Sequence, residues 1–325
     1  MPNRIFLLDT MSFIYRAYHA AAHQPIVMTT RAGFPTGATY IFCNMLRKLF
    51  EQHSPEHMVA VCDSPGETFR ERLSADYKAN RRGETPPDLV RQLPNIWRAV
   101  DAYRLPRLAV AGYEADDLIG TLARLAEEAD PEALVYIVSG DKDMLQLVDG
   151  RTYVINPMKD QVFDPAKVEE KVGVRPELVV DVMALRGDAA DNVPGAPGVG
   201  EKGSVAIIRQ FGSLEAALDG AAEIKRKQYR ESLQNNRERI LLSKRLVTIV
   251  RDVPGVGLDA GAARTPGPDK DVLAALYGEL EFASLLRREG LGAAEDFAAP
   301  LPPEDVAVGT TMTEAEADEA IDAIL

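Results

Sequence analysis

The chain has 325 residues, of which 46% are hydrophobic and 27% charged, and its net charge is −13. These proportions are typical of a globular protein with about two domains and a large core. No stretch approaches the roughly 18 apolar residues of a membrane helix, and the first apolar run stops at Asp9, too early for a signal peptide. The two cysteines, Cys43 and Cys62, form no zinc-type pattern, so we expect a reducing cytoplasm and no membrane contact.

Short apolar runs and helix-like segments alternate through the first half of the chain. Strands buried on both faces are predicted where the runs are rich in β-branched residues, at 5–8, 58–62 and 134–139. Helices are predicted at 12–22, 39–52, 88–103 and 115–129. This alternation predicts an α/β domain over residues 1–172, with a mostly parallel sheet flanked by helices.

One stretch of this domain, residues 64–87, is polar and highly charged and shows no apolar face. Aromatic and basic side chains are mixed in it: Phe69, Arg70, Arg72, Tyr77, Lys78, Arg81 and Arg82. A segment of this length without core residues is usually either disordered or functional. Because it follows directly on Asp63, at the end of a predicted strand, we favour a function.

From about residue 176 onward the chain shows no strand signal. Helices are predicted at 177–185 and 204–211, so we expect a smaller α-helical subdomain over residues 173–290. Its stretch 225–245 holds eight bases against two acids, which fits either a DNA-binding face or a solvated helix face. Residues 291–325 hold nine acids and no bases, and we expect an acidic linker or tail there. Without those acids the net charge of −13 becomes −4.

Nine carboxylates gather at five short places along the chain, and three of these places follow the predicted strands directly. The nine are Asp9, Asp63, Glu114, Asp116, Asp117, Asp141, Asp143, Asp188 and Asp191. Because the carboxyl ends of parallel strands meet at one edge of a sheet, we expect the strand-end groups to converge there. Like charges held so close need cations between them, and two Mg²⁺ ions bound by carboxylates can cleave a phosphodiester. The pattern predicts a metal-dependent phosphodiesterase, although helix capping or a turn would explain any one group alone.

A glycine-rich stretch over residues 193–202 leads into the predicted helix at 204–211. Its residues Gly195, Gly198 and Gly200, followed by Lys202, would present backbone N–H groups to a phosphate, with a plain loop as the alternative. Tyr15 and Arg16 follow Asp9 on the first predicted helix. An aromatic ring there would either stack on a displaced base or belong to the core.

With these residues assembled, the chain resembles the 5′-nuclease family, which includes the 5′–3′ exonuclease domain of bacterial DNA polymerase I, phage 5′ exonucleases and flap endonucleases. The resemblance spans residues 3–290 and rests on five segments in the family's order: FLLDTMSFIYRAY, VAVCDSPGETFRERLSADYKANRRGETP, GYEADDLIGTLA, VSGDKDMLQLV and LRGDAADNVPGAPGVGEKGS. It implies a PIN-like sheet and a helical arch at about residues 64–95. It also implies that the helical subdomain binds DNA through a helix-hairpin or helix-three-turn-helix motif.

The resemblance further implies which residues bind metal and DNA. Two Mg²⁺ ions, with Mn²⁺ as a substitute, would be held by Asp9, Asp63, Glu114 and Asp116 around the first ion and by Asp141, Asp143 and Asp191 around the second. Asp117 and Asp188 match additional acids of the bacterial and phage members. Lys78 and Arg81 match residues that approach the scissile phosphate. The remaining implied DNA contacts are Tyr15, Arg16, Arg70, Arg82, Gly195, Gly198, Gly200 and Lys202, with a potassium ion at the glycine turn.

The resemblance implies a structure-specific 5′–3′ exonuclease and flap endonuclease of DNA replication and repair. Its substrate would be DNA with a free 5′ end, a flap or a nick. We expect a cytoplasmic, nucleoid-associated monomer, either stand-alone or fused to or associated with a DNA polymerase.

Two positions depart from the family pattern. Thr10 stands where a glycine usually follows the first aspartate, and Gly203 stands where Thr or Ser usually follows Glu201-Lys202. Two other functions stay open at this point: a PIN-type ribonuclease, and a DNA-binding module that has lost catalysis. The arch and the glycine turn argue against the first, and the intact carboxylate set argues against the second.

Overall fold

A computed structural model describes residues 4–81, 83, 85–157, 159 and 161–291, so most of the predicted acidic tail lies outside the described residues. The strands are β1 (Arg4–Asp9), β2 (His57–Val61), β3 (Arg107–Leu108), β4 (Leu134–Val138), β5 (Thr152–Asn156) and β6 (Gln161–Phe163). The α-helices are α1 (Thr10–Ala22), α2 (Gly37–His53), α3 (Phe69–Leu73), α4 (Pro87–Ala102), α5 (Ala115–Ala129), α6 (Pro165–Val172), α7 (Val179–Arg186), α8 (Glu201–Phe211), α9 (Leu214–Asp219), α10 (Lys227–Asn235), α11 (Arg237–Val247), α12 (Lys270–Glu279) and α13 (Ala283–Arg288). Short 3₁₀ helices are η1 (Ala79–Arg81), η2 (Lys142–Leu147), η3 (Pro176–Leu178) and η4 (Ala221–Glu223).

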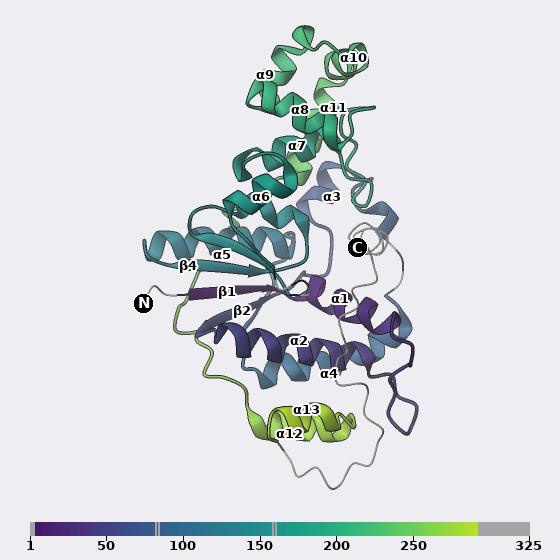
Figure 1. The fold of residues 1–325 in the computed structure, drawn as a ribbon, viewed down its shortest axis with the longest axis vertical. Coiled ribbons are helices and arrows are strands. Elements are labelled where there is room, and N and C mark those ends of the chain that lie inside the picture. Colours follow the sequence, from purple (N-terminus) through teal and green to yellow (C-terminus); the bar gives the residue numbers. More distant parts are fainter. Residues whose placement is uncertain (1–3, 82, 84, 158, 160, 292–325) are drawn as a thin grey trace.

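The strands form one sheet in the order β3-β2-β1-β4-β5-β6 (Figure 1). The pairs from β3 to β5 are parallel, and β6 runs antiparallel to β5. The predicted mostly parallel sheet is therefore confirmed, and the three predicted strands are its central members β1, β2 and β4. The prediction missed β3, β5 and β6. Two of these have only two and three residues, too few for an apolar run to show.

Helices cover both faces of the sheet, as the alternating pattern predicts. The four helices predicted in the first domain are confirmed to within two residues at each end. Helices α1, α2 and α4 lie on one face, against Phe6 and Leu8 of β1, and α5 lies on the other face, against Ile5 and Leu7 (Figure 1). Both side-chain sets of β1 are buried, which is why its sequence is continuously apolar.

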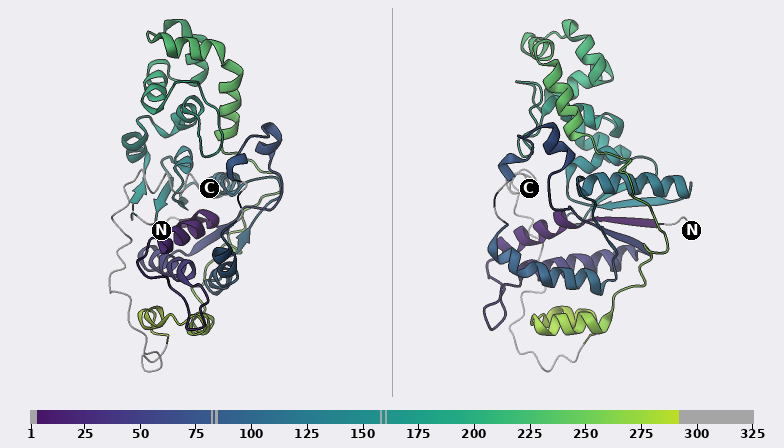
Figure 2. Two further views of the ribbon diagram at one scale, coloured as in Figure 1. Left: turned by 90° about the vertical axis from the view of Figure 1, so that its right-hand side faces the viewer. Right: turned by 180° about the vertical axis from the view of Figure 1, so that it is seen from behind.

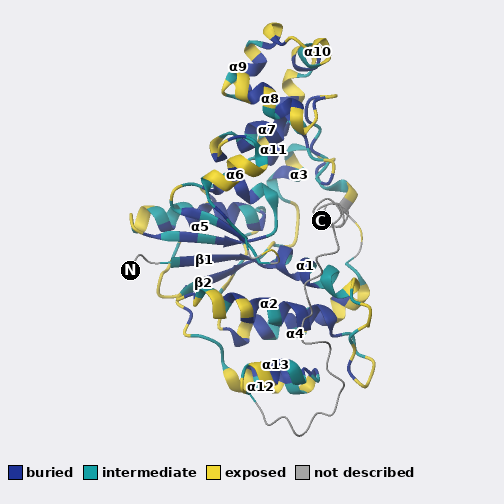
Figure 3. Cartoon of the chain, viewed as in Figure 1, coloured by how far each residue is buried: buried dark blue, intermediate teal, exposed yellow. Residues whose placement is uncertain are grey.

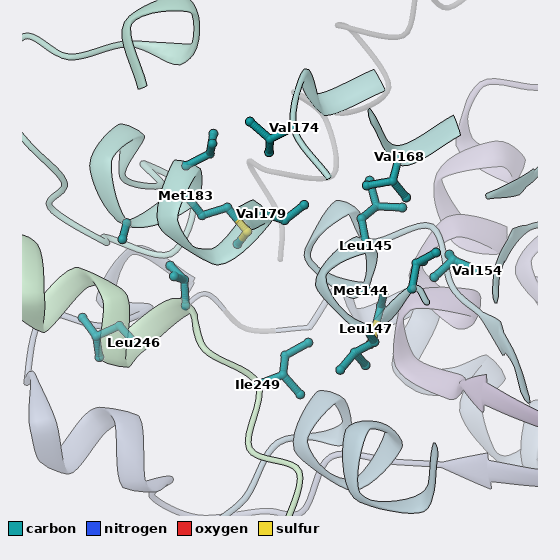
Figure 4. Close-up of a cluster of buried hydrophobic side chains, with 14 of the residues drawn as sticks. Met144, Leu145, Leu147, Val154, Val168, Val174, Val179, Met183, Leu246 and Ile249 are labelled. Carbon is teal, nitrogen blue, oxygen red and sulfur yellow. The ribbon is translucent and has the colours of Figure 1, made fainter. Parts of the chain in front are cut away.

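The helical subdomain, α7 to α11, extends from the face of the sheet that α5 covers. Its core is continuous with that of the sheet, because Met183 of α7, Leu246 of α11 and Ile249 belong to the same buried cluster as Met144 and Val154 (Figure 4). Buried positions accordingly run from the sheet into α7 and α8 (Figure 3). The two halves of the chain thus share one hydrophobic core.

After α11 the chain returns along the sheet and ends in α12 and α13, which lie beneath α2 and α4 (Figures 1 and 2). Backbone bonds fix this return: Met58 N donates to Ala263 O at 2.9 Å, and Thr265 N donates to Glu56 O at 2.7 Å. Leu276 and Tyr277 of α12 are fully buried in the same cluster as α2 and α4. None of the helices in the described residues is both long and apolar enough to span a membrane.

The polar stretch at 64–87 differs from the expectation that it lacks core residues. It contains α3 and η1, and the Tyr77 side chain between them is only 3% exposed. The capping box of α3, in which Thr68 and Glu71 bond to each other's backbone N–H groups, explains why a helix this short forms. The segment is therefore anchored to the domain at its first half.

Packing of α12 against the sheet domain predicts a stability effect. Leu276→Ala should lower the free energy of unfolding by about 2–5 kcal/mol, because it leaves a cavity at a fully buried position. Val272→Ala, on the same helix but 44% exposed, is the matched control and should stay within about 0.5 kcal/mol. Urea denaturation measures both. Equal effects of the two substitutions would show that α12 is not packed as described.

Candidate active site

Three carboxylates from the ends of neighbouring strands meet at one edge of the sheet. Asp9 ends β1 and pairs in register with Val61, two residues before Asp63, while Leu8 pairs with Val138 of β4. Ser139, the next residue, donates its hydroxyl to Asp9 Oδ2 at 2.7 Å and accepts from Asp141 N at 3.0 Å. The structure therefore brings the groups after β1, β2 and β4 together, as parallel strand ends require.

The first turn of α5 adds acids to the same edge. Asp63 Oδ1 accepts a hydrogen bond from Ala115 N at 2.8 Å, which fixes the start of α5 beside β2. Burial raises the pKa of Asp116 well above its usual range, and the charges of Asp141 and Asp9 add to the shift. Asp116 thus faces the strand-end carboxylates.

A second group of acids joins the two halves of the chain. Asp143 N donates to Asp141 Oδ1 at 2.8 Å, and Lys142 forms an ion pair with Asp188 at 3.4 Å. Burial raises the pKa of Asp143 well above its usual range, with further contributions from Asp141, Asp188 and Asp191. One pocket is lined by acids of both groups together with Tyr77: Glu114, Asp116, Asp143, Asp188 and Asp191.

The electrostatics of this edge favour bound cations. Burial raises the pKa of Asp9 to about 7; the hydrogen bond from Ser139 opposes this shift, and Asp63 and Asp141 add to it. Asp143 Oδ1 is buried without a hydrogen-bond partner among the described residues. Within that same part of the chain, no three acidic, histidine or cysteine side chains form a ready-made ligand group for one ion. The donor set fits a hard divalent ion that keeps much of its water shell, as Mg²⁺ does.

Arg70 and Asp117 form a buried ion pair. Asp117 is 0% exposed, and its two oxygens accept from the Arg70 guanidinium at 2.7 and 2.8 Å. Arg70 is 2% exposed and also donates to Glu114, Leu246 O and Thr248 O. The metal role of Asp117 and the DNA contact of Arg70 stay predictions, since in this structure the two side chains bind each other. The pair instead ties α3, α5 and the end of α11 together.

Lys78 lies at the site and is held there by its own backbone. Its φ of 50° is left-handed, and its N–H donates to Asp191 O at 3.0 Å. Its ammonium group lies 3.0 Å from Glu114 Oε1, whose other oxygen accepts from the Tyr77 hydroxyl at 3.1 Å. Two hydrogen bonds join this segment to the loop at 189–192. Asn80 of η1 donates to Ala189 O, and Asn192 donates to Asp76 O. Arg81 ends η1, but its side chain lies outside the described part, as does Arg82 entirely.

Tyr15 and Arg16 lie at the same edge on α1. The Tyr15 hydroxyl is 3.4 Å from Thr85 Oγ1, just before α4. Arg16 is 9% exposed, and its guanidinium fills the space that a side chain at position 140 would need. A glycine at position 140, the residue before Asp141, lets the Arg16 guanidinium pack directly against the backbone there.

The glycine turn divides into a structural and an exposed part. Gly195 is buried with φ at 58°, and its N–H donates to Ser243 Oγ at 2.9 Å. In this structure Gly195 shapes the turn, and its predicted DNA contact stays a prediction. Gly198, Gly200 and Lys202 are exposed and stay candidates.

Three contributors were missed by sequence reasoning. Ser139 links Asp9 to Asp141, the Tyr77 hydroxyl binds Glu114, and Ser243 holds the turn. Only Ser139 left a signal, as the polar residue that closes a predicted strand.

Two family models match the chain in succession. Residues 4–173 match the 5′-3′ exonuclease, N-terminal resolvase-like domain, and residues 174–271 match the 5′-3′ exonuclease, C-terminal SAM fold. A protein named 5′-3′ exonuclease from Aquifex aeolicus is 38% identical over 283 residues, covering 87% of this chain and 94% of that protein. DNA polymerase I of Pseudomonas aeruginosa is 43% identical over 310 residues, 92% of this chain and 33% of the polymerase. The chain thus spans about a third of the length of its polymerase relatives.

Solved structures share the fold at low sequence identity. T5 5′-exonuclease with bound divalent zinc is 20% identical with a TM-score of 0.64, covering 86% of this chain and 98% of that one. The catalytic core of Rad2 in complex with DNA substrate is 16% identical with a TM-score of 0.54, covering 86% and 88%.

The buried Arg70–Asp117 pair predicts a large stability effect. Arg70→Ala should lower the free energy of unfolding by about 3–5 kcal/mol, because it leaves the Asp117 carboxylate buried without its counter-ion. Arg72→Ala, on the same helix with its side chain 56% exposed, is the control and should change stability by less than about 1 kcal/mol. Chemical denaturation compares them. A small effect at Arg70 would mean that the pair does not hold the three segments.

Proposed function

Because the chain belongs to the 5′-3′ exonuclease family, we propose that it hydrolyses DNA phosphodiester bonds at a free 5′ end, as an exonuclease and flap endonuclease in replication and repair. The observation that carries this proposal is the pocket in which acids from the start of α5, from η2 and from the loop at 188–191 converge beside Tyr77. Lys78 is paired with Glu114, one of these acids. Such convergence of carboxylates suits the chemistry of a phosphodiesterase.

Divalent ions, Mg²⁺ with Mn²⁺ as a substitute, are proposed to bind these carboxylates. Asp9, Asp63, Glu114 and Asp116 would hold one ion, and Asp141, Asp143 and Asp191 the other, with Asp188, which is paired with Lys142, acting through water. When bound, the two ions supply an activated water and stabilise the leaving oxygen. Several of these carboxylates already accept a protein hydrogen bond, so each offers few oxygens and water completes the coordination.

Lys78 is proposed to act on the scissile phosphate together with Arg81. The Lys78 ammonium group is paired with Glu114, inside the carboxylate pocket, and its backbone is fixed to the Asp191 carbonyl. A phosphate that enters the pocket would meet this positive charge already positioned, which lowers the energy of the developing charge in the transition state. Arg16 lies beside Gly140 and would contact the substrate from the other side of Asp141.

The exposed part of the glycine turn is proposed to hold the DNA backbone away from the cut. Gly198 and Gly200 precede the first turn of α8, where backbone N–H groups point outward and Lys202 adds a positive charge.

Tyr15 is proposed to stack on the nucleotide beside the cut. Because several relatives are DNA polymerase I, we also propose a polymerase as the functional partner, by fusion or association.

Loss of a central carboxylate tests the catalytic proposal. Asp116→Asn should reduce flap cleavage at least about 100-fold, because it removes a charge that binds the ions, while flap DNA is still bound. Asp101→Asn, an exposed acid on α4, is the control and should cleave normally. Single-turnover cleavage with separate binding measurements distinguishes the two steps. Normal turnover of Asp116→Asn would refute the assignment.

Metal removal tests the proposed dependence on divalent ions, and the choice of substrate tests the proposed type of cleavage. A 5′-labelled flap should be cut in Mg²⁺ or Mn²⁺, left intact in EDTA, and cut again once Mg²⁺ is restored. Product lengths separate the two activities, since mononucleotides indicate an exonuclease and whole flaps an endonuclease. Faster cutting of single-stranded RNA than of the flap would instead favour a PIN-type ribonuclease.

A further inference from the structure

Position 203, in the first turn of α8, lies directly against the Tyr229 side chain. Gly203 is buried, and a Cβ there would lie 2.7 Å from the Tyr229 hydroxyl oxygen and 2.8 Å from Tyr229 Cζ. The Tyr229 ring, from α10, therefore occupies the place of the Thr or Ser side chain that the family usually carries.

Arg226 spans the exposed part of the turn. Its guanidinium carbon lies 4.1 Å from the centroid of the Tyr229 ring, and Nη1 donates to the Tyr229 hydroxyl at 2.6 Å. Its Nη2 donates to Gln228 Oε1 at 3.0 Å, and the Gln228 amide in turn fills the space beside Gly198. Nη1 thus bonds the side chain that lies against Gly203, and Nη2 bonds the side chain that lies against Gly198.

The hydrogen bonds to Tyr229 and Gln228 hold the Arg226 guanidinium in place without neutralising its charge. Arg226 is exposed, and both side chains that accept its hydrogen bonds are neutral. A guanidinium has five N–H donors, so donors are left for a bidentate contact with a phosphate. Stacking on Tyr229 reduces the side-chain freedom that such a contact would otherwise cost.

The same residues do not fit the potassium ion that the resemblance implies at this turn. Position 203 supplies no hydroxyl, and the hydroxyl that replaces it, on Tyr229, already accepts from a cation. A second cation beside Arg226 would be repelled. We propose that Arg226, positioned by Tyr229 and Gln228, supplies the positive charge of the glycine turn to a DNA phosphate in place of a potassium ion. The inference rests on the proposed DNA-binding function.

The test measures equilibrium binding of a 5′-flap duplex to the full chain in EDTA, where no cutting is needed. Arg226→Ala should weaken binding roughly tenfold and flatten the salt dependence by about one phosphate contact. Lys48→Ala, which removes the same charge from α2 on the far side of the sheet, is the control and should bind as the unaltered chain does. Equal affinity of Arg226→Ala and Lys48→Ala would overturn the proposal.

Two further measurements separate a positioned charge from a general one. Tyr229→Phe keeps the ring but loses the hydroxyl, so it should weaken binding less than Arg226→Ala yet measurably, with thermal unfolding confirming an intact fold. Unchanged affinity of Tyr229→Phe would mean that Tyr229 does not position Arg226. Replacing K⁺ by Na⁺ or Li⁺ at fixed ionic strength should leave the affinity unchanged within about twofold, and tighter binding in K⁺ alone would overturn the proposal.

A chain that binds the flap but never cuts it would refute the proposed function and leave this inference standing. Normal cutting together with an inert Arg226 would refute only the inference.

Discussion

Crowding of buried carboxylates at one edge of the sheet is the constraint on which the rest of the structure depends. Burial and mutual repulsion raise the pKa values of Asp9, Asp116 and Asp143, so these groups carry a cost that the fold has to offset. Hydrogen-bond donors stabilise several carboxylates of this edge in the charged form: Ser139 for Asp9, Ala115 N for Asp63, and Lys78 for Glu114. Each compensating group comes from a different segment. The need to satisfy acids therefore brings distant parts of the chain together.

Arg70 shows how far this coupling extends. Its guanidinium binds Asp117 and Glu114 of the α5 region and two carbonyls near the end of α11, while its backbone belongs to α3. The polar segment after β2, the sheet domain and the helical subdomain are thus joined by one buried cation. Removing Arg70 or Asp117 would leave its charged partner uncompensated in the interior, so substitutions at this pair are expected to affect the fold.

The central strands, the main helices and the convergence of strand-end acids could be predicted, because apolar periodicity reports burial directly and parallel topology then places the strand ends. What sequence could not reveal is the partner of each charge. The resemblance implies DNA contacts for Arg70 and Gly195, but it does not reveal that the Arg70 guanidinium binds Asp117 or that the Gly195 N–H binds Ser243. The burial of Tyr77 is likewise hidden in the sequence, because its neighbours along the chain are polar and its hydroxyl partner, Glu114, lies 37 positions away. The metal and DNA roles of the other residues stay predictions.

The return of the chain from α11 to α12 limits where the chain can be cut into fragments that fold. The two family models meet between residues 173 and 174, yet Ala263 and Thr265, far beyond that point, bond to β2 and its neighbour Glu56. A fragment ending at the junction would expose the apolar surfaces of α2 and α4 that α12 covers, as well as the side of α5 that faces Ile249. The boundary between the two family models therefore does not coincide with a boundary of packing. A truncated chain would have to keep the return segment and α12 together with the sheet.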